Sequence, residues 1–220
     1  MAATQKKKAP DKITLQKAYI QYTLEKGEYP GNVFQFCAWK SWQEADFYRH
    51  FGSLDALGSG IWDLFFEQTA GKLEQDPAYA EYGSRERMLG FFFSFFETLT
   101  PYRTYVLYAL EPKHGPAAQL RQLAGLRRHI RQFARQLPEG AGEPVTAPLG
   151  RIRNAVFPEA VWAQTLFLLR FWVKDGSAEF EKTDIAIEKS VHTLFDVMDH
   201  SPLDRVVDLG KFLIRENPIL

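Results

Sequence analysis

The segment from Leu24 to Leu57 contains the start and stop signals of several short helices, and it restricts the fold more than any other part of the chain. Gly27 is expected to end a first helix, because glycine readily adopts the left-handed conformation that follows helix C-termini. Asn32 is expected to cap a second helix, since its side-chain oxygen can accept a backbone N–H of the first turn. Ser53 is expected to cap a later helix. Short helices joined by tight turns are typical of a helix-turn-helix.

Apolar residues recur at helical spacing between these signals. Val33, Phe36 and Cys37 occupy positions i, i+3 and i+4, which predicts one buried face on the second helix. A polar break at Lys40-Ser41 separates this helix from a third short helix with an aromatic face. The residues predicted to share that face are Phe47, Tyr48 and Phe51.

Four short motifs occur in this segment, and the family that they resemble has them at the same spacings, without an insertion or deletion. In chain order they are Glu25-Lys26-Gly27, Asn32-Val33, Phe47-Tyr48-Arg49-His50-Phe51 and Ser53-Leu54-Asp55-Ala56-Leu57. In these motifs the segment resembles the DNA-binding head of the tetracycline-repressor (TetR) family of bacterial transcriptional regulators. The resemblance covers about the first quarter of the chain, and beyond it the all-helical pattern and the overall length agree.

The resemblance implies that the third helix is a recognition helix that approaches duplex DNA. The residues that it implies for DNA contact, mostly at phosphates, are Lys40, Gln43, Tyr48, Arg49 and His50. The segment departs from the usual family sequence at three places. Lys40-Ser41-Trp42 replaces Ala-Gly-Val in the turn, Gln43-Glu44-Ala45-Asp46 replaces Ser-Lys-Gly-Thr, and Leu54 replaces a basic residue. The two carboxylates of the recognition helix repel phosphates.

The charge balance gives the chain no overall attraction to nucleic acid. Lys plus Arg number 27 and Asp plus Glu number 27, so the net charge is zero. The first 57 residues carry eight basic and six acidic side chains, and three of the basic ones are Lys6, Lys7 and Lys8. This is a weak electrostatic signal for a DNA-binding head.

Several classes of protein are excluded by composition. Cys37 is the only cysteine, which excludes disulfide scaffolds and cysteine-rich zinc sites. No stretch of about eighteen apolar residues could span a bilayer, and the N-terminus lacks an apolar signal segment, so a cytoplasmic location is expected. No catalytic residues and no cofactor are expected, because no catalytic triad, phosphate-binding loop or paired-carboxylate motif occurs at a recognisable spacing.

Helical periodicity continues to the end of the chain, with few strand signals. It predicts one amphipathic helix over 116–137, two long helices over roughly 158–175 and 179–199, and a last helix over 203–216. The predicted fold is all-α with about nine to ten helices, comprising a three-helix head and a C-terminal helical bundle. The expected domains are a basic flexible tail over 1–10, a helix-turn-helix domain over 11–53 and a ligand-binding and dimerisation domain over 54–220.

The two long helices near the C-terminus are expected to form a homodimer interface. In the resembled family such a pair packs against its copy as a four-helix bundle. Apolar residues occur all around the first of the two helices, so one face needs a cover besides the core of its own subunit. The predicted interface residues are Trp162, Leu166, Leu169, Trp172, Ile187, Val191, Leu194, Phe195 and Met198. The alternative is a fully buried central helix in a monomer.

Five phenylalanines occupy six consecutive positions between Phe91 and Phe96, and they extend around more than one helix face. The resemblance implies that the middle helices enclose a cavity for an apolar or amphipathic effector, with tyrosine hydroxyls as its few polar contacts. The residues predicted to line it are Trp62, Phe66, Phe92, Phe95, Phe96, Tyr105 and Tyr108. The alternative is a dense aromatic core.

His192, Asp196 and His200 lie near one helix face at spacings of four, and first-row metals accept such ligands. A solvated or interface face is the commoner use of such a pattern, so no metal is expected.

Two functions remain. The first is a ligand-responsive regulator, a repressor that binds DNA as a homodimer and is released by an apolar small molecule. The alternative is a lipid-binding or hydrophobic-ligand-binding protein with the same fold that has lost DNA binding. The acidic recognition helix favours the alternative, whereas the complete motif from Phe47 to Phe51 favours the regulator, which is our main hypothesis.

Overall fold

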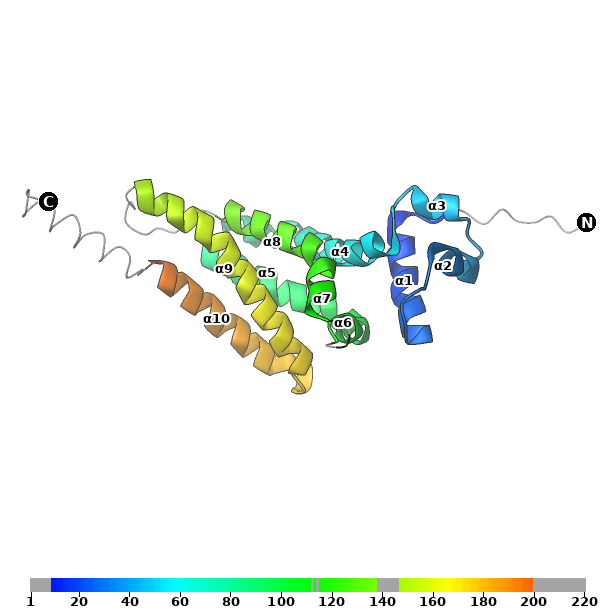
Figure 1. Cartoon of the computed structure of the whole chain (residues 1–220). Helices are drawn as coiled ribbons and strands as arrows, with labels where there is room; N and C mark the ends of the chain where they lie inside the picture. The colour runs from blue at the N-terminus through cyan, green and yellow to red at the C-terminus, as the bar shows by residue number, and fades with distance from the viewer. Residues whose placement is uncertain (1–8, 112, 114, 138–146, 200–220) are drawn as a thin grey trace, which may run out of the picture. The chain divides into compact units, whose positions relative to one another are not determined.

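The computed structural model of the chain describes residues 9–111, 113, 115–137 and 147–199 (Figure 1). Within these ranges the chain forms α-helices and short 3-10 segments and no β-strand, so the all-α prediction is confirmed. The basic tail at Lys6–Lys8, His200 and the predicted helix over 203–216 lie outside the described residues. None of the described helices is both long and apolar enough to cross a membrane.

The helices belong to two compact units, which are described separately. The first comprises Met1–Lys72 and Ser94–His129, and the second comprises Leu73–Phe93 and Ile130–Leu220. Three helices contribute residues to both units: α4 (Leu54–Glu74), α5 (Ser84–Leu99) and α8 (Ala124–Gln136).

The head at the start of the first unit consists of α1 (Lys12–Lys26), α2 (Val33–Lys40) and α3 (Glu44–Tyr48). Its helix ends form where the sequence predicts them. Gly27 follows α1 with a φ of 70°, in the left-handed region that glycine adopts most readily. The Asn32 side chain accepts a hydrogen bond of 2.8 Å from the backbone N–H of Gln35, which caps α2.

Phe36 is the centre of the aromatic core of the head. Its ring lies 6.0 to 6.1 Å from the rings of Tyr19, Trp42 and Phe47, in each case edge to face. Trp42, a bulky replacement for the usual family residue, is therefore accommodated against Phe36. The prediction that Tyr48 shares the buried face with Phe47 is wrong. Tyr48 is 53% exposed, because α3 ends at this residue and its side chain projects to solvent.

The rest of the first unit is formed by α4 (Leu54–Glu74), the end of α5, η2 (Thr100–Tyr102), α6 (Arg103–Ala109), α7 (Pro116–Gln122) and the start of α8. Ser53 Oγ accepts the backbone N–H of Ala56 at 3.1 Å, so the predicted cap of α4 is present. Gly60 has a packing role inside this helix. A Cβ atom there would lie 2.9 Å from the Phe51 ring, and the Gly60 carbonyl accepts a hydrogen bond from the Gln16 side chain.

The segment 116–137 forms two helices rather than the single predicted one. α7 ends at Gln122, Leu123 has φ and ψ of −82° and 1°, and α8 starts at Ala124. Leu120 is 54% exposed, whereas Leu123 and Leu126 are buried. A single helix over this segment would place the three leucines on one face, and the turn at Leu123 separates them.

The second unit contains η1 (Pro77–Glu81), the start of α5, the end of α8, α9 (Ala147–Lys174), η4 (Ala178–Phe180) and α10 (Glu181–Asp199). The predicted pair of long helices is present, and α9 begins earlier than predicted, with Pro158 inside it. α9 and α10 lie side by side and run in opposite directions (Figure 1). Asp175 fixes the turn between them by accepting hydrogen bonds from Ser177 and Thr183.

Candidate functional site

Four of the five residues predicted to contact DNA lie in the short helix α3 or directly beside it. Gln43 precedes the helix, Tyr48 ends it, and Arg49 and His50 follow it. The side chains of these four residues are exposed. Phe47, on the inner side of this helix, is fully buried and packs against Phe36. The head therefore presents a compact polar surface of the kind expected for a recognition helix.

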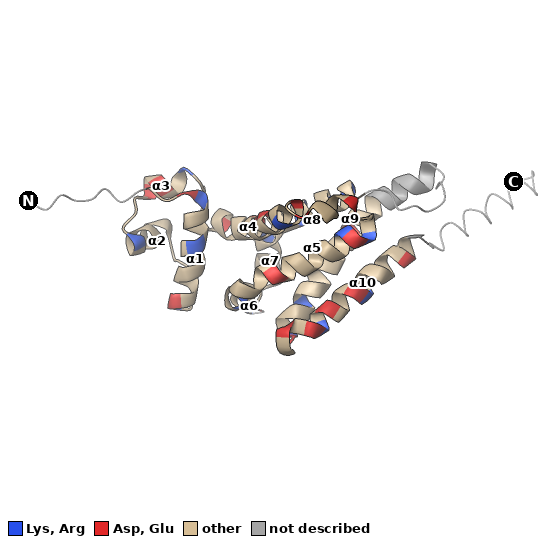
Figure 2. Cartoon of the chain, turned by 180° about the vertical axis from the view of Figure 1, so that it is seen from behind, with Lys and Arg blue, Asp and Glu red and all other residues tan. Residues whose placement is uncertain are grey.

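The basic side chains near this surface already have partners within the head. Arg49 forms an ion pair of 3.0 Å with Asp46 one turn earlier, and acidic residues are visible on α3 (Figure 2). The Lys40 ammonium donates a hydrogen bond of 2.9 Å to Gln21 and lies 4.0 Å from the centre of the Trp39 ring. Both cations must exchange these contacts for phosphate contacts if the surface binds DNA, which lowers the electrostatic gain.

The predicted effector-binding residues are mostly interior. Trp62, Phe92, Phe95, Phe96 and Tyr105 are buried. All of the predicted set except Phe92 belong to the first unit.

The two half-buried members of the predicted set have ring partners outside it. Phe66 stacks on His129 of α8 with a ring separation of 4.7 Å. Tyr108 packs edge to face against Tyr29 of the head at 5.0 Å. These two rings therefore also join the middle helices to other parts of the first unit.

Several buried polar atoms of the first unit lack a hydrogen-bond partner within the described residues, and three of them can donate. They are Trp62 Nε1, Thr98 Oγ1 and Tyr105 Oη. Complete burial raises the pKa of Tyr105 well above its usual value, so its hydroxyl stays protonated and can donate. An unsatisfied buried polar group costs about 1–3 kcal/mol. The aromatic interior therefore offers donors to an apolar molecule that carries an acceptor.

The predicted dimer residues lie mainly in the core of their own unit. Trp162, Leu169, Trp172, Ile187, Val191 and Phe195 are buried within the chain. Their side chains cannot form the contact surface of a dimer, because no partner can reach them without unfolding. Leu166, Leu194 and Met198 are half-buried, and of the nine predicted residues only Leu194 is among those that line the groove between α9 and α10.

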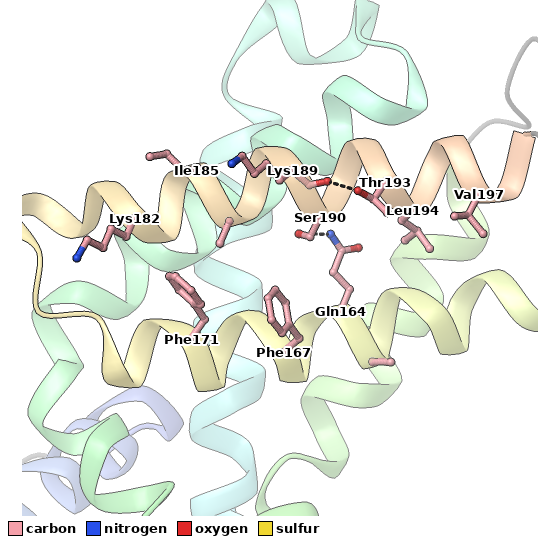
Figure 3. Close-up of a pocket in the computed structure, with 12 residues that line it drawn as sticks. Gln164, Phe167, Phe171, Lys182, Ile185, Lys189, Ser190, Thr193, Leu194 and Val197 are labelled. Carbon is pink, nitrogen blue, oxygen red and sulfur yellow. Dashed lines mark hydrogen bonds between the residues drawn. The ribbon is translucent and has the colours of Figure 1, made fainter.

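That groove is an open apolar depression of about 820 Å³ (Figure 3). On the α9 side, the rings of Phe167 and Phe171 point toward α10, next to Gln164 (Figure 3). The α10 side is lined chiefly by Ile185, Lys189, Leu194 and Val197. A hydrogen bond of 2.8 Å from Gln164 to Ser190 connects the two walls. The groove is therefore mainly apolar, with Gln164 and Ser190 as a polar pair across it.

The most exposed residues of this face are not among the predicted interface residues. Phe167, Ile185 and Val197 are 51%, 50% and 56% exposed. In α9 apolar residues occur on every side, so the pattern contains no signal that separates the inward face from the outward one. In α10 the buried row of Ile187, Val191 and Phe195 recurs every four residues, and Ile185 and Val197 lie off that row.

On the face of α10 that carries His192 and Asp196, an arginine occupies the position considered for a metal ion. The Arg85 guanidinium lies 2.8 Å from Asp196 Oδ1 and 3.1 Å from His192 Nδ1. A cation between the two side chains excludes a metal ion from that position. Elsewhere in the described ranges no group of three or more His, Cys, Asp or Glu side chains is placed to hold a metal.

The comparison with known families gives one match. The family model for the tetracyclin repressor-like C-terminal domain matches residues 87–213, which include α9 and α10 and make up more than half of the chain. Comparison with curated proteins gave no match. The match lies outside the head, whose motifs carry the separate resemblance to the same family. The protein therefore belongs to the TetR family, whose members are typically regulators rather than enzymes.

Proposed function

We propose that this protein is a cytoplasmic transcriptional repressor that binds duplex DNA as a homodimer and is released by an apolar or amphipathic small molecule. The observation that carries the proposal is the geometry of the head. Phe36 and Phe47 form its buried centre, and α3 with its flanking residues exposes Gln43, Tyr48 and His50 to solvent. Such an arrangement keeps a short helix rigid while its polar side chains remain available to a DNA groove.

The groove between α9 and α10 supports the homodimer. It lies within the matched C-terminal domain, and its exposed side chains are mainly large and apolar. Contiguous exposed apolar surface is typical of protein interfaces. A second copy of the same face is the natural cover, because a two-fold axis brings identical patches together. Two such subunits would place two heads on DNA.

The unsatisfied donors Trp62 Nε1 and Tyr105 Oη support the effector. A quinone or long-chain acid that reaches them would bury apolar surface and supply an acceptor. Binding to the native state raises the melting temperature by mass action. We expect such compounds to raise it in the wild type and to lose most of this effect in Tyr105→Phe, which keeps the ring and removes the donor.

The test of DNA binding is a selection from random duplexes at low salt. We expect the wild type to enrich a palindrome, and we expect Tyr48→Ala to lose the enrichment while keeping its fold, because Tyr48 is largely exposed. The variant Glu44→Lys/Asp46→Thr is run in parallel, since it removes both carboxylates and frees Arg49. If only this variant binds, and without enriching a site, the repressor proposal fails and the protein is a ligand-binding member of the fold.

A further inference from the structure

Glu44 is the first residue of the short helix α3, and its side chain is exposed. Within the described residues, no ion pair or hydrogen bond engages its carboxylate. Asp46, the other acidic residue of this helix, is half-buried and forms an ion pair of 3.0 Å with Arg49. Of the two carboxylates on α3, one is therefore neutralised by a neighbouring cation and the other is left to solvent.

The cations assigned to DNA contact differ from Glu44, because their hydrogen-bonding groups are engaged in the head. Arg49 pairs with Asp46, and the Lys40 ammonium donates to Gln21 at 2.9 Å. Guanine is usually read by an arginine or a lysine that donates to its O6 and N7. A carboxylate can only accept hydrogen bonds, so Glu44 selects a donor on whatever it meets.

Few groups on the base edges of duplex DNA can donate to a carboxylate. A recognition helix in the major groove turns its N-terminal residues toward those edges, and Glu44 is such a residue. Guanine and thymine present acceptors in that groove, whereas cytosine and adenine present an amino group. The adenine amino group lies between two acceptors, its own N7 and the O4 of thymine, but the cytosine amino group has only guanine O6 beside it. Acceptors repel a carboxylate, so cytosine is the favoured base.

We propose, on the basis of the DNA binding proposed above, that Glu44 reads a cytosine in each half-site of the operator by accepting a hydrogen bond from its N4 amino group. The negative charge weakens binding to every sequence, because phosphates lie near any side chain in the groove. Only a cytosine offsets this repulsion with a hydrogen bond. Glu44 thus contributes specificity rather than affinity.

The test is a selection from random duplexes at low salt with the wild type, Glu44→Gln and Glu28→Gln. We expect the wild type to enrich a half-site with one fixed C·G pair. Glu44→Gln should enrich A·T at that pair, because a glutamine amide matches adenine N6 and N7. Glu28→Gln is the matched control, since Glu28 is exposed between α1 and α2 and its replacement removes the same charge from the head. It should enrich the wild-type sequence.

A modified duplex tests the atom that is read. Pyrimidin-2-one in place of the cytosine lacks the amino group and keeps the rest of the ring. We expect it to weaken wild-type binding about tenfold. In Glu44→Ala the same modification should change the affinity by roughly twofold at most, because the acceptor is already absent. Comparing the two proteins also corrects for the weaker pairing of the modified base with guanine.

Affinity for arbitrary duplex separates base reading from simple repulsion. Glu44→Gln should bind arbitrary duplex more tightly than the wild type, because one charge near the phosphates is gone. If it binds every sequence more tightly and keeps the wild-type preference at every pair, Glu44 only repels phosphates and the proposal is overturned. Equal losses from the modified base in the wild type and in Glu44→Ala would also overturn it. So would a shift of the same pair in Glu28→Gln.

The same selection reports on the repressor proposal independently. A palindrome that the wild type and Glu44→Gln enrich with identical bases overturns the role of Glu44 and leaves the repressor proposal standing. A wild type that enriches no site overturns both.

Discussion

Ser41 occupies a backbone conformation that favours glycine. It follows α2 with a φ of 57°, and its backbone N–H donates to the Ala38 carbonyl at 3.1 Å. The resembled family usually has glycine at this turn. A side chain with a Cβ atom in the left-handed region costs about 1 kcal/mol relative to glycine. The head thus contains local strain between α2 and α3.

Replacing this residue should stabilise the protein. We expect Ser41→Gly to raise the free energy of unfolding by about 0.5–1 kcal/mol, because the relief of strain exceeds the added entropy of the unfolded chain. Ser41→Ala keeps the Cβ atom and should give no such gain. Urea denaturation followed by circular dichroism measures both. Equal effects of the two substitutions would contradict the assignment of strain to the Cβ atom.

Asp175 gives the turn between α9 and α10 a dependence on pH. Its carboxylate accepts four hydrogen bonds of 2.6 to 2.9 Å, from the backbone and the hydroxyls of Ser177 and Thr183. Burial alone would raise the pKa of this carboxyl, but the hydrogen bonds outweigh burial and lower it from 3.8 to about 2. Because the folded pKa lies below the unfolded one, the stabilisation is complete above pH 3.8 and is lost as the pH falls through about 2.

The corresponding variant should lose this dependence. At pH 7 we expect Asp175→Asn to lower the free energy of unfolding by about 1–3 kcal/mol, since an amide cannot accept all four hydrogen bonds. The difference from the wild type should shrink as the pH approaches 2. Ser177→Ala, which removes one donor, should give a smaller effect in the same direction. A constant difference across this pH range would contradict the role assigned to the carboxylate.

At the level of elements, the contact between α4 and α8 in the first unit depends on a glycine. His129 Nε2 lies 3.1 Å from Asp63 Oδ1, and the His129 ring stacks on Phe66. One turn earlier on α8, Gly125 faces the same carboxylate, and a Cβ atom there would overlap Asp63. The absence of a side chain at this position therefore allows the two helices to approach.

This packing predicts opposite effects for two similar substitutions. Gly125→Ala should lower the free energy of unfolding, because Asp63 must move away from His129 and the overlap outweighs the gain in helix propensity. Gly71→Ala is the matched control in α4, since a Cβ atom there meets nothing within 4 Å, and it should stabilise by about 1 kcal/mol. Thermal or urea unfolding checks both signs. A stabilising Gly125→Ala would show that α8 does not pack this closely on α4.

For the whole molecule, the groove between α9 and α10 predicts the response of the assembly to mutation. Phe167→Glu and Val197→Glu place a charge on an exposed apolar face, so they should give folded monomers in sedimentation at micromolar concentration. Val156→Glu is the control, because Val156 is 50% exposed on α9 and does not line the groove. It should remain dimeric.

A second comparison separates dissociation from unfolding. Trp172→Glu introduces a charge into a fully buried site, so it should unfold the second unit rather than release a folded monomer. A wild-type monomer over the whole concentration range, or dissociation by Val156→Glu as readily as by Phe167→Glu, would contradict the proposed interface.

Short-range interactions explain which features could be predicted from the sequence. The caps at Asn32 and Ser53 and the stop at Gly27 involve partners within four residues along the chain, so the residue types alone determine them. The same holds for the helical periodicity and hence for the all-α fold. The head could be recognised from the sequence because its motifs are local and closely spaced.

Packing between residues distant in the chain decided which apolar side chains face outward and where one predicted helix is divided. Phe167 and Ile185 are chemically equivalent to Phe195 and Ile187, yet the first two face outward and the last two are buried. The turn that divides 116–137 into two helices likewise has no strong local signal, because Leu123 is an ordinary helix former.

In the head, the sequence likewise gives the positions of the charged residues, whereas the fold determines their partners. The sequence placed Lys40 and Arg49 near the recognition helix, but only the folded structure shows Lys40 bound to Gln21, which is 19 residues away. The Gln16 side chain likewise donates to the Gly60 carbonyl, which is 44 residues away. The sequence by itself determined the helices and their ends, because those depend on neighbours along the chain. The tertiary structure decided which apolar faces remain exposed and which polar groups lack partners, because both depend on residues that only folding brings together.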